Sequence, residues 1–209
     1  MSTFTKSVCA LTVAAAFMAA PASAAIVSAD FRAEFDLPEA SFGSGARVLE
    51  NLGASVGAGV ELDADDEIAN PSSWDGGVDV DLAADGLLTL TGREEGFGGD
   101  FDFASVMISN VMFSQGQEII GFTVVGGTGI FSSAGLSPFP TVRIGSDFLS
   151  LSVDTTGSGN VSDFFFAEGG TAIFQLELSP PQVPLPAGGL LLGAAVMGLG
   201  LARRKKRTA

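Results

Sequence analysis

The stretch Val78–Thr91 reads VDVDLAADGLLTLT, and its pattern decides the fold class. Apolar and acidic residues alternate over Val78–Leu82, and leucine and threonine alternate over Leu88–Thr91. A period of two is typical of a strand with one buried face. Asp85-Gly86 stands between the two runs, and an Asp-Gly pair in that place favours a tight hairpin turn. The stretch therefore predicts two antiparallel strands joined by a turn.

The same alternation recurs later in the chain, and glycine-rich breaks separate the runs. Between residues 25 and 182 no long stretch has the i, i+3, i+4, i+7 spacing of an amphipathic helix. Short strands with glycine turns predict a mainly β fold, a single antiparallel β-sandwich of jelly-roll type with about ten strands. All 17 Phe residues except Phe4 and Phe17 fall in this region, and we expect them to fill the space between the sheets. The further runs are Ile120–Val124, Leu149–Val153 and Phe174–Leu178, and the breaks include Gly96–Gly99, Gly126-Gly127, Gly157–Gly159 and Gly169-Gly170.

The composition of the 209 residues excludes several classes of function. The chain has no His, so a Ser-His-Asp or Cys-His nucleophile and a His-ligated metal are excluded. Its net charge of −14 argues against nucleic acid as a partner, because binding to nucleic acid needs Lys and Arg to neutralise phosphates. All 24 acidic residues lie within residues 25–182. Adaptation to salty water and binding of multivalent cations are the two interpretations of that charge.

Residues 1–24 have the features of a cleaved secretory signal peptide. Lys6 supplies positive charge, an apolar run follows over Val8–Ala20, and Ala22-Ser23-Ala24 is an A-x-A cleavage site. The alternative is an uncleaved N-terminal anchor. Cleavage would remove Cys9, the one cysteine of the chain, so the exported protein would have no disulfide.

The C-terminal end has the features of a membrane anchor. Ala187–Ala202 is an uninterrupted apolar run, which as a helix extends about 24 Å at 1.5 Å per residue. Flanking side chains that snorkel to the interface complete a membrane span of roughly 30 Å. The alternative is a soluble core helix. We expect the basic residues after the run to act as a stop-transfer signal that stays in the cytoplasm while the N-terminal domain lies outside. These residues are Arg203, Arg204, Lys205, Lys206 and Arg207.

A proline-containing motif, Val183-Pro184-Leu185-Pro186-Ala187, precedes the apolar run. This motif, the Gly-rich apolar helix and the basic cluster, in a chain with an export signal, resemble the PEP-CTERM class of sorting tails. The five residues match the VPLPA variant, whereas the PEP-type motif has Glu where this chain has Leu185. The resemblance covers residues 183–209 only.

The resemblance implies a processing route for the protein. The tail would be the substrate of an exosortase, a membrane Cys transpeptidase or protease that cuts near the motif. Cutting would release the protein or transfer it to the cell surface. The resemblance also implies a Gram-negative bacterium and a link to extracellular polysaccharide or biofilm.

The densest acidic run, Glu61–Glu67, is the first candidate for chemistry. Asp63-x-Asp65 is similar to the start of an EF-hand, but Ile68 stands where that loop needs Gly and Trp74 where it needs Glu. The EF-hand is therefore rejected. A looser Ca²⁺ site and a solvated acidic loop remain as the two interpretations of this run.

Two further groups are candidates for enzymatic or binding roles. Glu94-Glu95 and Asp100 with Asp102 flank a Gly-rich loop, an arrangement that suits either a carboxylate pair of a hydrolase or a surface turn. Trp74 and the run Phe164–Phe166 suit either sugar stacking or packing, and packing is the interpretation we favour. No catalytic residue is assigned, and the protein is expected not to be an enzyme.

The sequence thus predicts five segments. They are a signal peptide over 1–24, a β-sandwich over 25–179, a Pro-rich spacer with the sorting motif over 180–186, a transmembrane helix over 187–202 and a basic cytoplasmic tail over 203–209. We expect an exported, non-catalytic surface or matrix protein, first held in the inner membrane. The alternative is a lectin-like, Ca²⁺-dependent polysaccharide-binding module, and the third interpretation is a hydrolase with an acidic pair.

Overall fold

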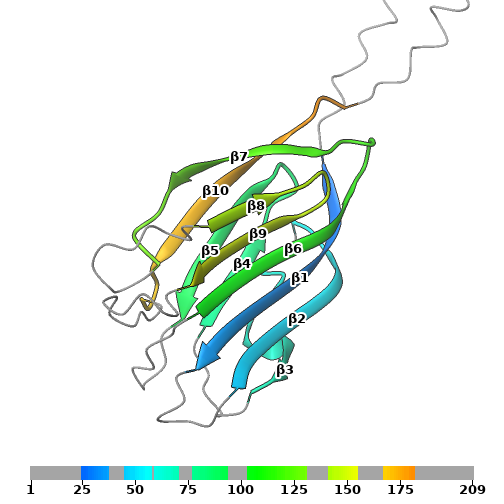
Figure 1. The fold of residues 1–209 in the computed structure, drawn as a ribbon. Coiled ribbons are helices and arrows are strands. Elements are labelled where there is room, and N and C mark those ends of the chain that lie inside the picture. Colours follow the sequence, from blue (N-terminus) through cyan, green and yellow to red (C-terminus); the bar gives the residue numbers. More distant parts are fainter. Residues whose placement is uncertain are drawn as a thin grey trace, which may run out of the picture. The chain divides into compact units, whose positions relative to one another are not determined.

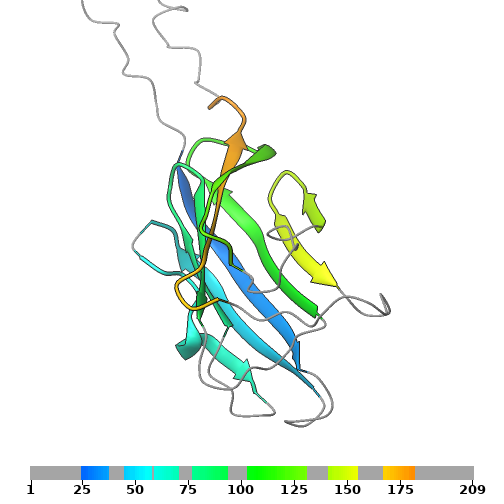
Figure 2. The same cartoon turned by 90° about the vertical axis from the view of Figure 1, so that its left-hand side faces the viewer.

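The computed structural model describes residues 25–37, 45–57, 59–70, 77–93, 103–130, 141–154 and 167–181. All of them belong to one compact unit, Ala24–Gln182. These residues form ten strands and one short 3₁₀ helix, η1 (Ala64–Asp66). The strands make two antiparallel sheets that pack as a sandwich, which confirms the predicted mainly β fold (Figures 1 and 2).

The first sheet, sheet A, has six strands in the order β3-β2-β1-β6-β9-β8 (Figure 1). Its strands are β1 (Ile26–Leu37), β2 (Gly45–Ser55), β3 (Glu67–Ala69), β6 (Phe103–Phe113), β8 (Thr141–Ile144) and β9 (Leu149–Asp154). The second sheet, sheet B, has the order β4-β5-β10-β7. Its strands are β4 (Gly77–Leu82), β5 (Leu87–Arg93), β7 (Ile119–Gly126) and β10 (Thr171–Leu178).

In sheet A, β6 returns to lie beside β1 after the β4–β5 hairpin, which belongs to sheet B. A jelly roll contains two Greek keys of four consecutive strands each. The described strands therefore support the sandwich, and the jelly-roll likeness stays a prediction.

The hairpin predicted from the opening stretch is present as β4 and β5. Leu82 lies opposite Leu88, and the turn between them is closed by a hydrogen bond of 2.9 Å from the Gly86 amide to the Ala83 carbonyl. Gly86 has φ 89°, a left-handed conformation that glycine adopts without strain. The alternating apolar residues of the hairpin are buried and the polar residues between them are half-buried, as the alternation predicts. Leu87, which precedes the alternating run, is half-buried as well.

The other three predicted runs are also strands, and they differ in burial. In β10 the last predicted apolar residue, Leu178, is half-buried. The other predicted apolar residues of β9 and β10 are buried, namely Leu149, Leu151, Val153, Phe174 and Leu176. The run Ile120–Val124 forms most of β7, but Ile120 is 60% exposed and Val124 is 53% exposed. β7 is the edge strand of sheet B, so its alternating apolar residues are only partly covered.

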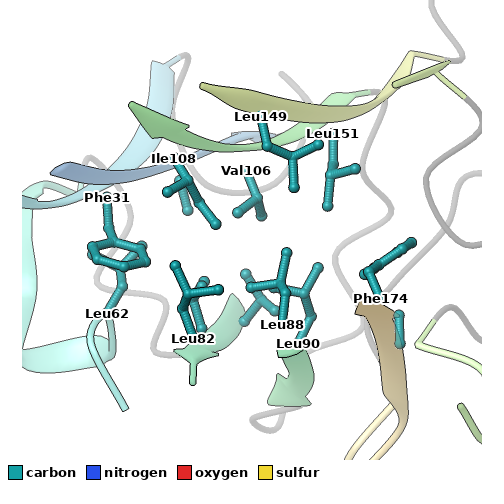
Figure 3. Packing of buried hydrophobic residues seen from close by; sticks show 14 of the residues in the cluster. Phe31, Leu62, Leu82, Leu88, Leu90, Val106, Ile108, Leu149, Leu151 and Phe174 are labelled. Atoms are coloured by element: carbon teal, nitrogen blue, oxygen red, sulfur yellow. The ribbon is translucent and has the colours of Figure 1, made fainter. Parts of the chain in front are cut away.

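The core lies between the sheets, where apolar side chains of each sheet point toward those of the other. Figure 3 shows Phe31, Ile108 and Leu151 of sheet A facing Leu82 and Leu88 of sheet B. Burying one such side chain fully contributes about 1.5–3 kcal/mol. Aliphatic residues supply most of this core, so the expectation that Phe would fill it is only partly met: among the described Phe residues, Phe31, Phe35 and Phe174 are buried, whereas Phe148 is 37% exposed.

The two ends of the domain lie at the same end of the sandwich. β1 begins there and β10 ends there, as both views show (Figures 1 and 2). The β6–β7 turn, residues 114–118, lies at this end as well, because hydrogen bonds join it to Ala25 and to Ser179. We call this end of the sandwich, defined by Ala25, Ser114–Glu118 and Ser179, the exit pole.

Candidate functional site

The residues predicted to carry export and processing lie outside the described residues. They are Ala22 and Ala24 of the signal, Val183–Ala187 of the sorting motif, the run Ala187–Ala202 and the basic residues Arg203–Arg207. The same holds for Trp74, Asp75, Glu94, Glu95, Asp100, Asp102 and Phe164–Phe166. Within the described part of the chain, no helix has the length and apolar character needed to cross a bilayer.

The exit pole is the described region nearest in sequence to both predicted signals. The Ser114 amide donates a hydrogen bond of 3.0 Å to the Ala25 carbonyl, and the Ser179 amide donates one of 2.8 Å to the Glu118 carbonyl. The first and last residues of the turn thus hold the entry and the exit of the domain. One short turn therefore fixes where both ends of the chain leave the fold.

The exit residue Ser179 has two more contacts with this turn. The Glu118 amide donates to the Ser179 hydroxyl at 2.9 Å, and the side-chain amide of Gln117 donates to the Ser179 carbonyl at 3.1 Å. Gln117 is buried, although it lies on a turn, and its Oε1 atom has no partner among the described residues. Burying an unpaired oxygen costs free energy. Four contacts of the turn therefore hold the two ends of the domain.

Backbone hydrogen bonds also fix the flanks of the turn. The Val111 amide donates to the Asp147 carbonyl at 3.0 Å, and the Ile119 amide donates to the Ser146 carbonyl at 2.9 Å. These bonds tie the β8–β9 turn to the strands on either side of the β6–β7 turn. Gly116, with φ 61°, supplies the left-handed residue that the tight turn needs. The exit pole is thus braced by both sheets.

The acidic run Glu61–Glu67 is built into the fold rather than gathered into a site. Glu61 is only 4% exposed, and its carboxylate accepts hydrogen bonds from the Leu82 amide at 2.6 Å and the Gly57 amide at 2.8 Å. Burial raises the pKa of Glu61, and these two hydrogen bonds oppose that effect; the nearby charge of Asp81 adds to the rise. Asp63 caps η1, where its side chain accepts from the Asp65 amide at 2.8 Å.

Two further carboxylates of this region are paired with arginines. Glu67 lies 3.0 Å from a guanidinium nitrogen of Arg47, which is 1% exposed. Asp79 accepts from Nε of Arg93 at 2.9 Å. Burial raises the pKa of Asp79, and the Arg93 charge partly opposes that rise. Within the described ranges, no three or more of the Asp, Glu, His and Cys side chains are placed together as metal ligands.

Sequence reasoning missed the buried polar residues Arg47, Glu61 and Gln117. Arg47 and Glu61 lie next to apolar neighbours, and nothing in the local pattern separates them from solvated charges. Their partners Glu67 and Leu82 are about twenty positions away in sequence. For Gln117, the turn composition Ser-Gln-Gly-Gln indicates a turn but gives no sign that the turn holds a chain end.

No family model matches this chain, and no curated protein and no solved structure matches it. The function proposed below therefore depends on the sequence signals and on the geometry of the exit pole.

Proposed function

We propose that this chain is an exported, non-catalytic surface or extracellular-matrix protein. Its signal peptide directs export, its C-terminal helix holds it in the inner membrane, and an exosortase-like enzyme processes it at Val183–Ala187. The protein then reaches the cell surface or the medium, in association with extracellular polysaccharide.

The observation that carries this proposal is the hydrogen bonding of Ser179 to the β6–β7 turn. Ser179 is the last residue before the Pro-rich spacer, and it is held through its amide, its hydroxyl and its carbonyl. A domain held at one end in this way is suited to display from a tether. The folded part ends at a fixed point, and the processing motif begins within a few residues of it.

The composition of the spacer fits processing close to the domain. A polyproline-like segment extends about 3.1 Å per residue, so the four steps from Ser179 to Val183 would span roughly 12 Å. Two prolines in the motif lack backbone N–H donors and favour extended neighbours, which presents the cleavage region as an open strand. A cut within the motif would therefore fall after the last strand and leave the sandwich intact.

The position of Ala25 in the fold supports the predicted signal-peptide cleavage site after Ala24. Cleavage after Ala24 would leave Ala25 as the first residue, and the carbonyl of Ala25 is already bound by Ser114. The mature chain would then begin within the folded domain, with no free N-terminal extension. A strongly acidic domain, with a net charge of −14 for the whole chain, also remains soluble outside the cell.

The described carboxylates of the acidic region have structural roles. Glu61 fixes a loop to β4, Asp63 caps η1, and Glu67 and Asp79 pair with arginines. Each of these groups has a structural use that accounts for its position.

Cell fractionation tests the proposal. The full chain and a chain ending after Gln182 are expressed in a Gram-negative host without an exosortase. We expect the full chain in the inner membrane with its N-terminal domain outside, and the shortened chain in the soluble periplasm. Recovery of the full chain from the cytosol with residues 1–24 retained would contradict both export and anchoring.

A further inference from the structure

The first residue of the described domain, Ala25, is held from two sides. Its carbonyl accepts a hydrogen bond of 3.0 Å from the Ser114 amide, and the amide of Ile26 donates one of 2.8 Å to the Ala84 carbonyl. Both bonds belong to one peptide group, the one that joins Ala25 to Ile26. The peptide group is therefore fixed between the β6–β7 turn and the β4–β5 turn.

The geometry of this peptide group places the start of the domain on the side of the β4–β5 turn. In a planar trans peptide, Cα of the first residue lies on the same side of the C–N bond as the N–H of the second. Since the N–H of Ile26 points to Ala84, Cα of Ala25 lies toward that turn as well. Three bonds separate the nitrogen of Ala25 from the nitrogen of Ile26, so the two atoms are at most about 4 Å apart.

A carboxylate follows Ala84 directly. Asp85 is exposed, and its Oδ1 atom accepts a hydrogen bond of 3.2 Å from the Leu87 amide. In the peptide group between Ala84 and Asp85, the carbonyl oxygen lies on the same side of the C–N bond as Cα of Asp85. The oxygen that binds Ile26 and the start of the Asp85 side chain are thus on one side of that peptide. The backbone therefore brings the nitrogen of Ala25 and the Asp85 side chain to the same part of the turn.

The other ionisable groups of this region are acidic. The β4–β5, β6–β7 and β8–β9 turns meet at the exit pole, and residues 83–86, 114–118 and 145–148 include no Lys or Arg. The end of β2, residues 54–57, is bonded to β1 and is uncharged. A positive charge on the nitrogen of Ala25 would be attracted to all the charges of these turns and of the end of β10. Those charges are Asp85, Glu118, Asp147 and Glu177.

We propose that removal of the signal peptide creates an ion pair between the α-ammonium group of Ala25 and the carboxylate of Asp85. This step rests on the proposed cleavage after Ala24. Hydrolysis of the peptide bond between Ala24 and Ala25 adds one water and leaves a carboxylate on Ala24 and an amine on Ala25. The amine has an ordinary pKa of about 7.7–8.0, so it is largely protonated at neutral pH. The domain is therefore more stable after cleavage than with its signal peptide attached.

Titration of the α-amine in the mature chain, residues 25–209 in mild detergent, tests the pair. With Lys205→Arg and Lys206→Arg this amine is the one amine of the mature chain, and reductive methylation with ¹³C makes it visible by NMR without removing its charge. Asp85→Asn should lower the pKa of the amine by about 0.2–0.7, the equivalent of an exposed ion pair. The turn tolerates this change, because Asn-Gly also favours a tight hairpin.

Asp65→Asn is the matched control for this titration. It removes the same charge at an exposed position of η1, at the other end of the sandwich from the exit pole (Figure 1). Salt screens charges over such a distance, so the pKa of the amine should change by less than about 0.1. Equal pKa values of the amine in Asp85→Asn and Asp65→Asn would overturn the proposal.

Acetylation of the α-amine gives a second measurement, because it removes the positive charge. It should lower the urea midpoint of the wild-type mature chain and leave the midpoint of Asp85→Asn nearly unchanged, since the pair is already lost there. An equal fall in both proteins would overturn the pair. The amine is released from a fusion protein by a protease that leaves Ala25 first. A missing ion pair is thus distinguished from a missing cleavage in cells, which mass spectrometry of the exported chain reports by itself.

Discussion

The carboxylate of Glu61 accepts a hydrogen bond from the backbone amide of Leu82 across 2.6 Å, in a place where both residues are buried. This contact joins the loop after β2 to the end of β4. The second hydrogen bond of Glu61, from the Gly57 amide, closes the loop on itself. An acidic run that has the composition of a solvated surface loop thus begins with a residue of the interior.

The position of Glu61 predicts a pH dependence of stability. Burial raises its pKa above the ordinary value of 4.5, so the folded state binds this proton more tightly than the unfolded state does. The stabilisation linked to this group is therefore present at acidic pH and is lost as the pH rises from about 4.5 through the folded pKa. Glu61→Gln cannot titrate. In urea titrations, the free energy of unfolding of the wild type, relative to this variant, should fall as the pH rises above the ordinary value of 4.5.

Asp79, whose pKa is also raised, is present in both proteins, so its contribution cancels in that difference. A difference that grows with pH would show that the hydrogen bonds from Leu82 and Gly57, rather than burial, dominate the pKa of Glu61.

The ion pair of Arg47 and Glu67 predicts a second measurable loss. Arg47 is 1% exposed, so Glu67→Gln would remove a carboxylate from a buried charge. We expect the free energy of unfolding to fall by about 1–2 kcal/mol, less than for a fully buried pair because Glu67 is partly exposed. Glu50→Gln is the control: its pair with Arg32 is more exposed, and its loss should cost under about 1 kcal/mol. Equal losses would show that burial of Arg47 does not strengthen its pair.

The exit pole predicts a local effect of Gln117. Gln117→Ala removes the donor to the Ser179 carbonyl and should lower the free energy of unfolding by about 1–2 kcal/mol. It should also speed hydrogen exchange at the Ser179 amide. Gln115→Ala, in the same turn but half-buried, should change both quantities much less. If exchange at Ser179 is the same in the two variants, the side chain of Gln117 does not hold the exit.

The basic tail predicts an effect on membrane topology. Replacing Arg203, Arg204, Lys205, Lys206 and Arg207 with neutral residues should impair anchoring, because positive charge holds the end of the helix in the cytoplasm. Membrane fractionation with protease protection measures this directly. Unchanged retention and topology would contradict the stop-transfer role.

How far the sequence predicts the fold depends on how cleanly each strand alternates. The β4–β5 hairpin alternates without a break and was predicted in full, turn included. β1 and β6 are longer, but their apolar and polar residues do not alternate regularly enough to predict them as strands. In β1 the register shifts between Ala29 and Phe31, and two of its buried positions are alanines, which give a weak apolar signal. In β6 the apolar residue Met107 is exposed, and it stands between the buried residues Val106 and Ile108. Three apolar residues in a row interrupt the alternation of apolar and polar residues.

An interaction between side chains accounts for part of this irregularity. Asp30 accepts hydrogen bonds of 2.6 Å from the Asn110 side chain and from the Gly53 amide, where β1, β6 and β2 lie side by side. Asn110 has φ 51°, so the period of β6 changes at this residue. A contact between residues 80 positions apart leaves no trace in a window of local sequence.

The exit pole could not be predicted for a related reason. Three of its four contacts use a backbone amide as donor, and two of those are wholly backbone, so side-chain types carry little information about them. The sorting tail is the opposite case, since its signals consist of residue types in a fixed order and are read without a structure.

Mass spectrometry of both termini of the protein, isolated from the cells that make it, is the most direct test of the central claim. We predict a chain that begins at Ala25 and ends within or next to Val183–Ala187, alone or joined to another molecule. A chain that is intact from residue 1 to Ala209 and dissolved in the cytosol would contradict the account.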